Sequence, residues 1–595
     1  MLDRPALLGV VRSATARRWV GPSAEVERLG RAIAQTAGLP EIVGRVLAAR
    51  GVEPDQAPVY LAPTLRDLMP DPSTLADMDV AAERLVTAVR SHQRIAIFGD
   101  YDVDGASSAA MLHDWLAALG IAATVHIPDR LAEGYGPNGP AMQRLAQAHD
   151  LILCVDCGTV AHEPLAVATK AGAEVVVIDH HQPGEALPAV TAVVNPNRHD
   201  CPSGLGQLCA AGVVFLLLVA ANRLLRAGGT GAPDLMPALD LAAVATVADV
   251  APLTGLNRAF VRQGLAVMAG RSRPGLAALA DVAGLSAPPR SVDHAVVLGP
   301  RLNAGGRVGD AALAVRLLTA TCPSEARILA AELEAMNVAR RRIEAEVTEA
   351  AFAEAEARIE RTDGACRLAW AAGEGWHPGV VGIVASRLRE RFDRPAVVIA
   401  VRDGHARGSA RSVPGVDIGA AIAAVCRDGL LSEGGGHAMA AGLGVAADAV
   451  EAAMAALERR LAREGEEAAH GAPLTLGIDA LVAPSAATPD LVSALEAAGP
   501  YGQSSPPPRV AVAGVVPQGT RLSERGHLSL RLAVPGGGPA LSSIAFGAGA
   551  NGLAPLLEAC ATRRAPVHVA GRLEVDDWGG RRRAKLRIED AAEPV

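Results

Sequence analysis

The sequence predicts an α/β protein in which two α/β domains, joined by a long helix, precede a C-terminal β-barrel of the OB type. Three observations lead to this fold class. Continuous apolar runs alternate with helical segments in the first half, as in a parallel sheet buried on both faces. The longest helical stretch follows at residues 324–362. The last segment contains five short apolar runs separated by Gly/Pro turns, which is typical of a small barrel.

The length of 595 residues is too great for one hydrophobic core and predicts about three or four domains. Residues 1–77 contain short helical stretches with Pro-rich breaks, and we expect them to pack on the α/β domain that follows. The following parts are expected to be a first α/β domain at 78–323, a long helix at 324–362, a second α/β domain at 363–470 and an OB-like domain at 471–595.

Composition restricts the function only loosely. The net charge of −8 does not indicate a general nucleic-acid binder, so any DNA path must be a local basic groove. Eight scattered cysteines form no disulfide framework, and Cys154 and Cys157 are predicted to be buried thiols beside Asp156 rather than zinc ligands. The longest apolar run, 209–221, is shorter than the ~20 residues of a membrane span. A soluble, cytoplasmic protein with no membrane partner is expected.

Acidic residues follow the first apolar run of the sheet. Residues 95–99 end at Asp100, Asp102 and Asp104, and a helix is predicted from 106 to 119. In α/β sheets this edge, outside the carboxyl ends of the strands, is where ligands bind. Carboxylates this close repel one another unless a cation offsets their charge, and their oxygens suit Mg²⁺, Mn²⁺ or Ca²⁺. For this segment alone, a solvated acidic turn is the alternative.

The same pattern recurs along the sheet. Residues 151–155 end at Asp156, and residues 175–178 end at Asp179-His180-His181. A further acid, Asp249, ends another apolar stretch. Mixed Asp/His ligation favours manganese or zinc over calcium, and several carboxylates predict two ions ~3.5–4 Å apart. Such a pair activates a water and stabilises the charge of displacement at phosphorus, so the pattern predicts a phosphohydrolase.

The ordered motifs resemble those of a known superfamily. Gly99–Gly105, Val155–Gly158, Asp179–His181 and Val247–Asp249 resemble the four motifs of the DHH phosphoesterase superfamily. Downstream, Pro300–Arg307, Trp376–Gly379, Gly408–Ser412 and Gly434–Gly442 resemble one family within it, the bacterial single-strand-specific DNA exonucleases that degrade from the 5′ end. The similarity extends from about Trp19 to the C-terminus.

On this resemblance, our hypothesis is that two Mn²⁺ or Mg²⁺ ions are held at the acidic edge. The expected ligands are Asp102, Asp104, Asp156, His180 and Asp249, with Asp156 as the bridge. Asp100 is either a further ligand or a structural turn acid. His181, the remaining catalytic residue, is expected to contact the scissile phosphate, and Asp179 to orient an imidazole. Some superfamily members have a histidine at the position of Phe98, so one ion is expected to keep more water and bind loosely.

Phosphate-binding residues are expected in the second α/β domain. The run Gly434–Gly436 lets backbone N–H groups approach an anion, and His437 can donate to a phosphate oxygen, although a flexible turn would also explain the glycines. Arg411 is a candidate phosphate clamp. The full expected set is His181, Asn303, Arg307, Ser409, Arg411, Gly435, Gly436 and His437.

Two further segments each have two possible interpretations. The loop Gly134–Asn138 is either a buried turn or a substrate-side loop. The helix at 324–362 is given Ser324 as its N-cap, and a polar turn at Asn337 and Arg340–Arg342 interrupts its apolar stripe. A solvated face is the ordinary explanation of such charges, whereas the resemblance implies a helix that bridges two domains beside the DNA cleft. The predicted stripe consists of Ile328, Leu329, Leu333, Met336, Ile343 and Val347.

The C-terminal segment predicts a barrel for single strands. From Tyr501 to Val595 there are twelve Lys/Arg against eight Asp/Glu, concentrated at Arg581–Lys585. Aromatic residues are few (Tyr501, Phe546 and Trp578), so electrostatic contact is expected to outweigh stacking. The predicted strands are 509–516, 527–533, 541–546, 567–575 and 582–588.

The resemblance therefore implies a metal-dependent exonuclease that degrades single-stranded DNA 5′→3′ to mononucleotides in recombination and repair. A monomer is expected, working beside a helicase and a single-stranded-DNA-binding protein. Two rivals remain: a phosphodiesterase for short oligonucleotides or cyclic dinucleotides, and a non-enzymatic single-strand-binding scaffold. The first would not need the last ~120 residues, and the second should have lost its acids, which are present here.

Overall fold

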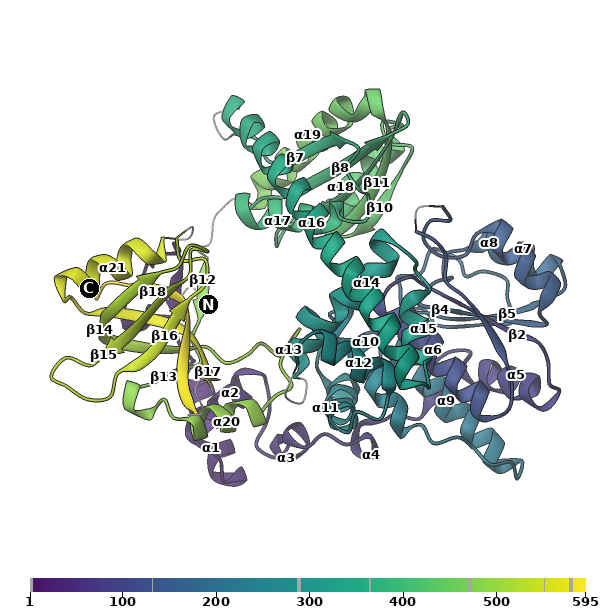
Figure 1. Cartoon of the computed structure of the whole chain (residues 1–595), viewed down its shortest axis with the longest axis horizontal. Helices are drawn as coiled ribbons and strands as arrows, with labels where there is room; N and C mark the ends of the chain where they lie inside the picture. Colours follow the sequence, from purple (N-terminus) through teal and green to yellow (C-terminus); the bar gives the residue numbers. More distant parts are fainter. Residues whose placement is uncertain are drawn as a thin grey trace. The chain divides into compact units, whose positions relative to one another are not determined.

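The computed structural model describes residues 4–130, 132–285, 290–362, 365–468, 474–549, 552–576 and 582–594. Arg581 and Trp578, expected in the barrel, lie outside these residues. The chain forms two compact units (Figure 1). The smaller unit comprises Met1–Met69, Pro252–Arg262 and Ala472–Val595, and the larger comprises Pro70–Ala251 and Gln263–Gly471.

The first sheet of the larger unit has five parallel strands in the order β3-β2-β4-β5-β6. They are β2 (Ile95–Gly99), β3 (Ala123–His126), β4 (Leu151–Val155), β5 (Glu174–Ile178) and β6 (Ala192–Val194). This is a doubly wound order in which the chain switches direction between β2 and β4. Ligands of such sheets bind at the carboxyl ends of the two strands that flank the switch. The predicted parallel sheet is confirmed.

Helices cover this sheet. They are α5 (Met78–Arg90), α6 (Val103–Ala118), α7 (Gly139–Ala148), α8 (His162–Lys170) and α9 (Ala210–Ala227). On the side of α7 and α8, Phe98, Ile152 and Val177 belong to one buried apolar cluster. Helix α9 has the length and hydropathy of a membrane span, but 72% of it is buried inside the protein. It is therefore a core helix, packed against α5 and α6.

A helical layer leads from this sheet to the second one. Its members are α10 (Leu239–Ala248), α11 (Gly255–Ala269), α12 (Pro274–Val282), α13 (Ser291–Asp293), α14 (Gly299–Val308), α15 (Leu313–Thr319) and α16 (Pro323–Arg361). The first half of α16 packs on α12, α14 and α15. In its second half, Val347, Ala351 and Ala355 pack against the second sheet (Figure 1). The predicted linking helix is thus a single, continuous element.

Two details of α16 differ from the prediction. The helix begins at Pro323, with Cys322 rather than Ser324 at the N-cap, because proline at the first position needs no N–H partner. The stripe is wrong at Ile328, whose side chain is 61% exposed. Asn337 and Arg340 are buried instead, so this part of the polar turn is not a solvated face.

The second α/β domain contains a mixed sheet in the order β10-β11-β9-β8-β7. Its elements are β7 (Ala369–Glu374), α17 (Val381–Phe392), β8 (Ala396–Arg402), β9 (His405–Arg411), α18 (Ile418–Arg427), β10 (Glu433–His437), β11 (Ala440–Ala446) and α19 (Val450–Ala468). The glycine run forms the edge strand β10 rather than a flexible turn, since Glu433 to His437 pair antiparallel with β11.

The smaller unit contains the predicted barrel. Its elements are β12 (Thr475–Gly477), β13 (Ala480–Leu481), α20 (Pro489–Ala497), β14 (Val510–Leu522), β15 (Leu528–Ala533), β16 (Leu541–Ala545), α21 (Leu553–Arg563), β17 (Val567–Asp576) and β18 (Arg583–Ala592). The strands pair in the order β14-β15-β16-β18-β17, and β17 pairs with β14 to close the barrel. Helix α21 lies between the third and fourth strands, as in an OB fold, so the predicted fold is confirmed.

Most of the N-terminal segment, up to Met69, belongs with the barrel to the smaller unit, whereas residues 70–77 belong to the larger unit, where Asp71 and Asp77 pair with Arg223 and Arg198. The expected packing on the first α/β domain thus holds only for the end of the segment. The segment contains β1 (Arg18–Val20), α1 (Ala24–Ala37), α2 (Glu41–Ala49), α3 (Ala57–Leu61) and α4 (Leu65–Leu68). Strand β1 pairs in parallel with β12. The fully buried indole of Trp19 donates to the buried carboxylate of Asp590 on β18 at 2.8 Å. A buried hydrogen bond to a charged group contributes more than a neutral one.

A buried guanidinium joins the three chain segments of the smaller unit. Arg258 is 2% exposed, and its donors reach the carbonyl oxygens of Tyr60, Ala498, Gly499 and Pro500 at 2.6–3.0 Å. The guanidinium also stacks on the Tyr60 ring, 3.7 Å from its centroid. Burying this charge is tolerated because backbone dipoles and the ring replace the lost water.

We expect Arg258→Gln to lower the free energy of unfolding of the smaller unit by about 3 kcal/mol, because several buried carbonyls lose their donor. Thermal melting followed by circular dichroism measures the change. The exposed Arg521→Gln in the same unit is the matched control and should melt like the wild type. Equal melting of all three proteins would contradict the role assigned to Arg258.

Candidate metal centre

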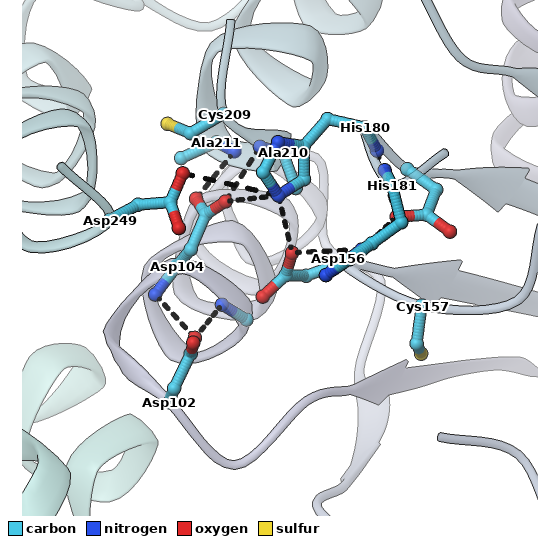
Figure 2. Close-up of polar contacts among 12 residues, drawn as sticks. Asp102, Asp104, Asp156, Cys157, His180, His181, Cys209, Ala210, Ala211 and Asp249 are labelled. Atoms are coloured by element: carbon cyan, nitrogen blue, oxygen red, sulfur yellow. Dashed lines mark hydrogen bonds and ion pairs between the residues drawn. The ribbon is translucent and has the colours of Figure 1, made fainter. Parts of the chain in front are cut away.

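The predicted acids and histidines converge at the carboxyl ends of β2, β4 and β5 (Figure 2). Asp100, Asp102 and Asp104 lie in the turn from β2 into α6, and Asp156 directly follows β4. Asp249 comes from elsewhere, since it caps the C-terminus of α10 rather than ending a strand. The structure thus gathers residues far apart in sequence at the switch point of the sheet.

His180 lies at the middle of the cluster. Its Nε2 is 3.2 Å from Asp156 Oδ1, 3.7 Å from Asp104 Oδ2 and 4.0 Å from Asp249 Oδ2. Three groups have possible ligand atoms that all lie within 4.8 Å of one another. They are Asp156 with His180 and His181, Asp104 with His180 and Asp249, and Asp100 with Asp102 and Asp156. Asp156 and His180 each belong to two groups, and of the two only the carboxylate has a second oxygen with which to bridge two ions.

Backbone donors hold two of the carboxylates in place. The amides of Ala210 and Ala211, at the N-terminus of α9, donate to the two oxygens of Asp104 at 2.6 and 2.8 Å. A helix N-terminus stabilises a carboxylate through its free N–H groups and its dipole. Asp102 is the N-cap of α6, and its Oδ1 accepts from the amides of Asp104 and Gly105 at 2.8 and 3.1 Å.

The other carboxylates carry negative charge only at a cost, which either a proton or a bound cation offsets. Burial raises the pKa of Asp100 and Asp156 well above the usual range of an aspartate, and neighbouring carboxylates raise it further. Burial, with the charges of Asp104 and Asp102, raises the pKa of Asp249 to about 8. One oxygen of Asp100 and one of Asp156 are buried and accept no hydrogen bond in the described part of the chain; the nearest imidazole nitrogen to the latter is His180 Nε2, at 3.2 Å. Such oxygens fit a bound hard divalent ion.

A second layer of side chains fixes the histidines. Asp179 Oδ1 accepts from His181 Nδ1 at 2.7 Å and from the amides of His180 and His181. Burial alone would lower the pKa of His181, but the hydrogen bond and charge of Asp179 outweigh it and raise the pKa to about 9. Asn195 and Asn197 donate to the carbonyls of His181 and His180.

The backbone around the acids leaves no room for larger residues. A Cβ at Gly105 would lie 2.5 Å from the carbonyl oxygen of Asp100, and one at Gly306 would lie 2.5 Å from that of Tyr101. Asn303, on α14 with Gly306, accepts from the amide of Val103 at 3.0 Å. This is why the Pro300–Arg307 motif lies against the metal-binding turn. Asp156 has a φ of +61°, a strained value for a residue other than glycine.

Three neighbours of the cluster contribute no ligand. Phe98 is fully buried in the core below α7 and α8, so its position offers no donor to a metal. Cys154 and Cys157 are free, fully buried thiols, which confirms the prediction that they are core cysteines. Figure 2 shows Cys157 directed away from the carboxylates.

Two cavities of the larger unit open beside the cluster. The first, about 920 Å³, is lined by Ala248 and Asn303 at the metal centre and extends along α16. The second, about 520 Å³, lies between the loop around Tyr135 and strands β9 to β11. The hydroxyl of Tyr135 is 3.3 Å from the His181 ring, and its side chain is 51% exposed. Within the Gly134–Asn138 loop, Tyr135 is thus exposed and lines the second cavity, whereas Gly136 and Pro137 are buried, and a substrate-side role for the loop stays a prediction.

The expected phosphate-binding residues divide between these cavities. Asn303 and Arg307 line the first, whereas Ser409 and Gly435 line the second. Nothing lies within 4 Å of the position of a Cβ at Gly435, so its backbone is open to a ligand. The other two residues of the second domain, Arg411 and His437, and the adjoining Gly436 line neither of these two cavities.

Sequence reasoning missed several residues that shape the centre. They are Thr159, Asn195 and Asn197, which hold the His180–His181 segment or Asp179, and the amides at the start of α9. The asparagines follow strand β6, so the rule of polar residues after a buried strand would have found them. No local pattern marks Ala210 and Ala211, because they act through backbone N–H groups.

Overlapping groups of carboxylates and imidazoles, beside cavities lined by arginines, are suited to hydrolysis of a phosphoester by two metal ions. The fold and the site thus define a metal-dependent phosphoesterase. Residues 94–246 match the DHH family N-terminal domain, residues 365–463 the DHHA1 domain and residues 478–590 the RecJ OB domain.

Known proteins match along nearly the whole chain. The chain is 37% identical over 567 residues to the single-stranded-DNA-specific exonuclease RecJ of Dickeya dadantii, with 93% of this chain and 96% of that protein covered. Identity to the Escherichia coli RecJ is 35% over 571 residues, with the same coverage. The chain belongs to the RecJ family of single-stranded-DNA-specific exonucleases.

Solved structures of a RecJ protein have a similar fold to this chain. RecJ from Thermus thermophilus in complex with Mn²⁺ superposes with a TM-score of 0.79 at 31% identity, covering 97% of this chain and 80% of that one. A second structure of that protein, in complex with Mg²⁺, gives a TM-score of 0.72 at 29% identity, covering 97% and 78%. The predicted family is confirmed.

Metal binding to this centre should release protons. In the metal-free site Asp249 has a pKa of about 8, so it is protonated at pH 6–7 and must lose its proton to bind an ion. The affinity for Mn²⁺ should therefore rise with pH up to about 8 and then level off. Calorimetry in two buffers of different ionisation heat measures the release, expected at about one proton or more near pH 6. Binding without proton release would contradict the raised pKa.

Proposed function

We propose that this protein is a metal-dependent exonuclease that degrades single-stranded DNA 5′→3′ to mononucleotides. The observation that carries the proposal is the oxygen-rich cluster around Asp156, placed at the switch point of a sheet and flanked by two cavities. The relatives are named single-stranded-DNA-specific exonucleases, and the chain covers 96% of the Dickeya dadantii and Escherichia coli proteins.

We assign the metal-holding role to Asp102, Asp104, Asp156, His180 and Asp249, and add Asp100 because its buried oxygen has no donor in the described residues. Two bound ions supply Lewis-acid activation of a water and charge stabilisation at phosphorus. The chain's contribution is to keep these ligands in place without reorganisation. Asp104 is fixed by the N-terminus of α9, and Asp102 by its N-cap role.

His181 is proposed to hold the scissile phosphate. Its Nδ1 donates to Asp179, and its raised pKa keeps the imidazolium protonated at neutral pH. The Nε2–H can then donate to a non-bridging phosphate oxygen, where negative charge develops. Tyr135, 3.3 Å from the ring, limits how far the imidazole can turn.

The second cavity is proposed to hold the 5′-terminal nucleotide. Its two arginines, Arg130 and Arg407, are balanced in number by Glu133 and Glu433, and Arg407 lies 3.9 Å from Glu433. Arg130, Ser409 and the open backbone of Gly435 are the proposed phosphate donors. Tyr101 and Tyr135 offer aromatic surface for a base. The first cavity is proposed to receive the following nucleotides, because it begins at Ala248 beside the metal ligand Asp249. Arg411 and His437 stay predicted phosphate ligands that would have to approach from outside these cavities.

The barrel is proposed to bind the strand beyond the catalytic unit. Two of its arginines are engaged inside the protein, since Arg509 and Arg572 both pair with Glu589 at 2.5 and 2.7 Å. Contact with the phosphate backbone therefore depends on its other basic residues, and affinity should fall with salt.

A cytoplasmic location, a monomeric state and partnership with a helicase and a single-stranded-DNA-binding protein remain proposals. Eight free cysteines support a reducing compartment. The partners rest on the family resemblance alone. The two rival functions are not favoured, because the chain retains both its acids and its barrel.

Polarity and metal dependence can be tested in one digestion. We expect immediate release of labelled mononucleotide from a 5′-labelled single-stranded oligonucleotide and progressive shortening of a 3′-labelled one, in Mn²⁺ but not in EDTA. Matched duplex should resist. Turnover of dinucleotides without cleavage of long strands would favour the small-substrate rival, and binding without hydrolysis would favour the scaffold.

Substitution of His180 and of His181 should have different effects, because only His180 is proposed to bind a metal ion. His180→Gln should weaken Mn²⁺ binding, because His180 contacts three carboxylates of the cluster. His181→Gln should leave Mn²⁺ affinity nearly unchanged but reduce kcat by about 10²–10³, as the loss of one donor to a developing charge does. Calorimetry and single-turnover kinetics distinguish the two, and a large loss of Mn²⁺ affinity in His181→Gln would make His181 a ligand instead.

A further inference from the structure

The cavity along α16 is cationic but contains an internal anion. Its lining includes Arg301, Arg307, Arg340, Arg341 and Arg387, against the two acids Glu344 and Glu349. One end lies next to the acidic turn, because Asn303 lines the cavity and also accepts from the amide of Val103 at the start of α6.

Glu344 bridges two of these arginines. Its Oε2 accepts from Arg340 Nη1 at 2.6 Å, and its Oε1 from Arg387 Nη2 at 3.3 Å. The side chain of Glu344 is only 12% exposed, so solvent screens the pair weakly. Its carboxylate therefore accepts hydrogen bonds from α16 and from α17 at the same time. A planar anion between two guanidinium groups has the charge and spacing that a phosphate diester would present.

The two arginines differ in freedom. Arg340 is 8% exposed, its Nη2 donates to Asn337 Oδ1 at 2.9 Å, and its Nε has no partner in the described part of the protein. Arg387 is half exposed and can turn toward the cavity. Arg340 is thus fixed in place and keeps one N–H that makes no hydrogen bond, whereas the Arg387 guanidinium can move.

We propose that Arg340 and Arg387 form a seat for a backbone phosphate of the single strand, and that Glu344 occupies this seat until the strand displaces it. This inference rests on the proposed function and assigns three residues that the metal centre does not use. A backbone phosphate that binds in this cavity therefore competes with the Glu344 carboxylate for Arg340 and Arg387. Glu344 thus lowers the affinity of this cavity for polyanions.

The prediction is a change in salt dependence. Each phosphate contact with single strands contributes about 0.7 to the slope of log K against log salt, which amounts to about fivefold in affinity over a tenfold salt range. Glu344→Gln should bind a single-stranded oligonucleotide more tightly at low salt and with a steeper slope of about this size. Arg387→Gln should bind more weakly, with a shallower slope.

The experiment is fluorescence anisotropy of a labelled thymidine oligonucleotide in EDTA over a salt series. Glu356→Gln is the matched control, because Glu356 pairs with Arg391 at 3.3 Å between the same two helices but lies outside the cavity lining. It should bind like the wild type. Thermal melts confirm that each variant is folded, and the exposed Arg387→Gln keeps the test open if Glu344→Gln unfolds.

The outcomes separate this inference from the proposed function. Unchanged slopes in Glu344→Gln and Arg387→Gln, in a wild type that binds and digests single strands, would overturn the phosphate seat alone. A change of equal size in Glu356→Gln would also overturn it, because the effect would then be a general one of charge. Failure of the wild type to bind or digest single strands would instead overturn the proposed function.

Discussion

The structure depends on burying several carboxylates at one edge of a parallel sheet. Burial and mutual repulsion raise the pKa of Asp100, Asp156 and Asp249, so the protein must offset negative charge there. The protein itself offsets part of this negative charge, through the amides at the N-terminus of α9 and the protonated imidazole of His181. Bound cations can offset the rest of the negative charge. A fold that satisfied every oxygen internally would have no affinity left for a metal.

This constraint explains the crowding around the site. The turn after β2 must carry three acids and start a helix at once, so Gly105 and Gly306 allow backbones to approach where a Cβ would clash. Asp156 adopts a left-handed conformation after β4. Such strain is retained where the surrounding structure holds a reactive group in place. Asn303 on α14 ties the turn to the helical layer and to the cavity along α16.

Helix α16 joins the helical layer of the larger unit to its second sheet. One half belongs to the helical layer and the other to the core of the second sheet, so the arginines of its middle turn are held at the cavity wall. Burial of Arg340 with Asn337 and Glu344 costs solvation, which a structural helix would avoid by using apolar residues. Retaining ionic groups there is consistent with an anionic ligand. In the smaller unit, the buried Arg258 and the Trp19–Asp590 pair instead unite distant segments.

The sequence by itself determined the parallel sheet, the barrel strands, the long helix and nearly all the acids of the metal centre. Buried parallel strands are continuous apolar runs, their carboxyl ends share one edge, and polar residues at those ends must therefore meet. Only the tertiary structure decided the packing of the N-terminal segment on the barrel, the strand made by the glycine run, and the helical origin of Asp249. It also decided which arginines of α16 are buried, and the donors of α9. These features depend on pairings between distant segments and on backbone groups that every residue carries, so they leave no local pattern to read.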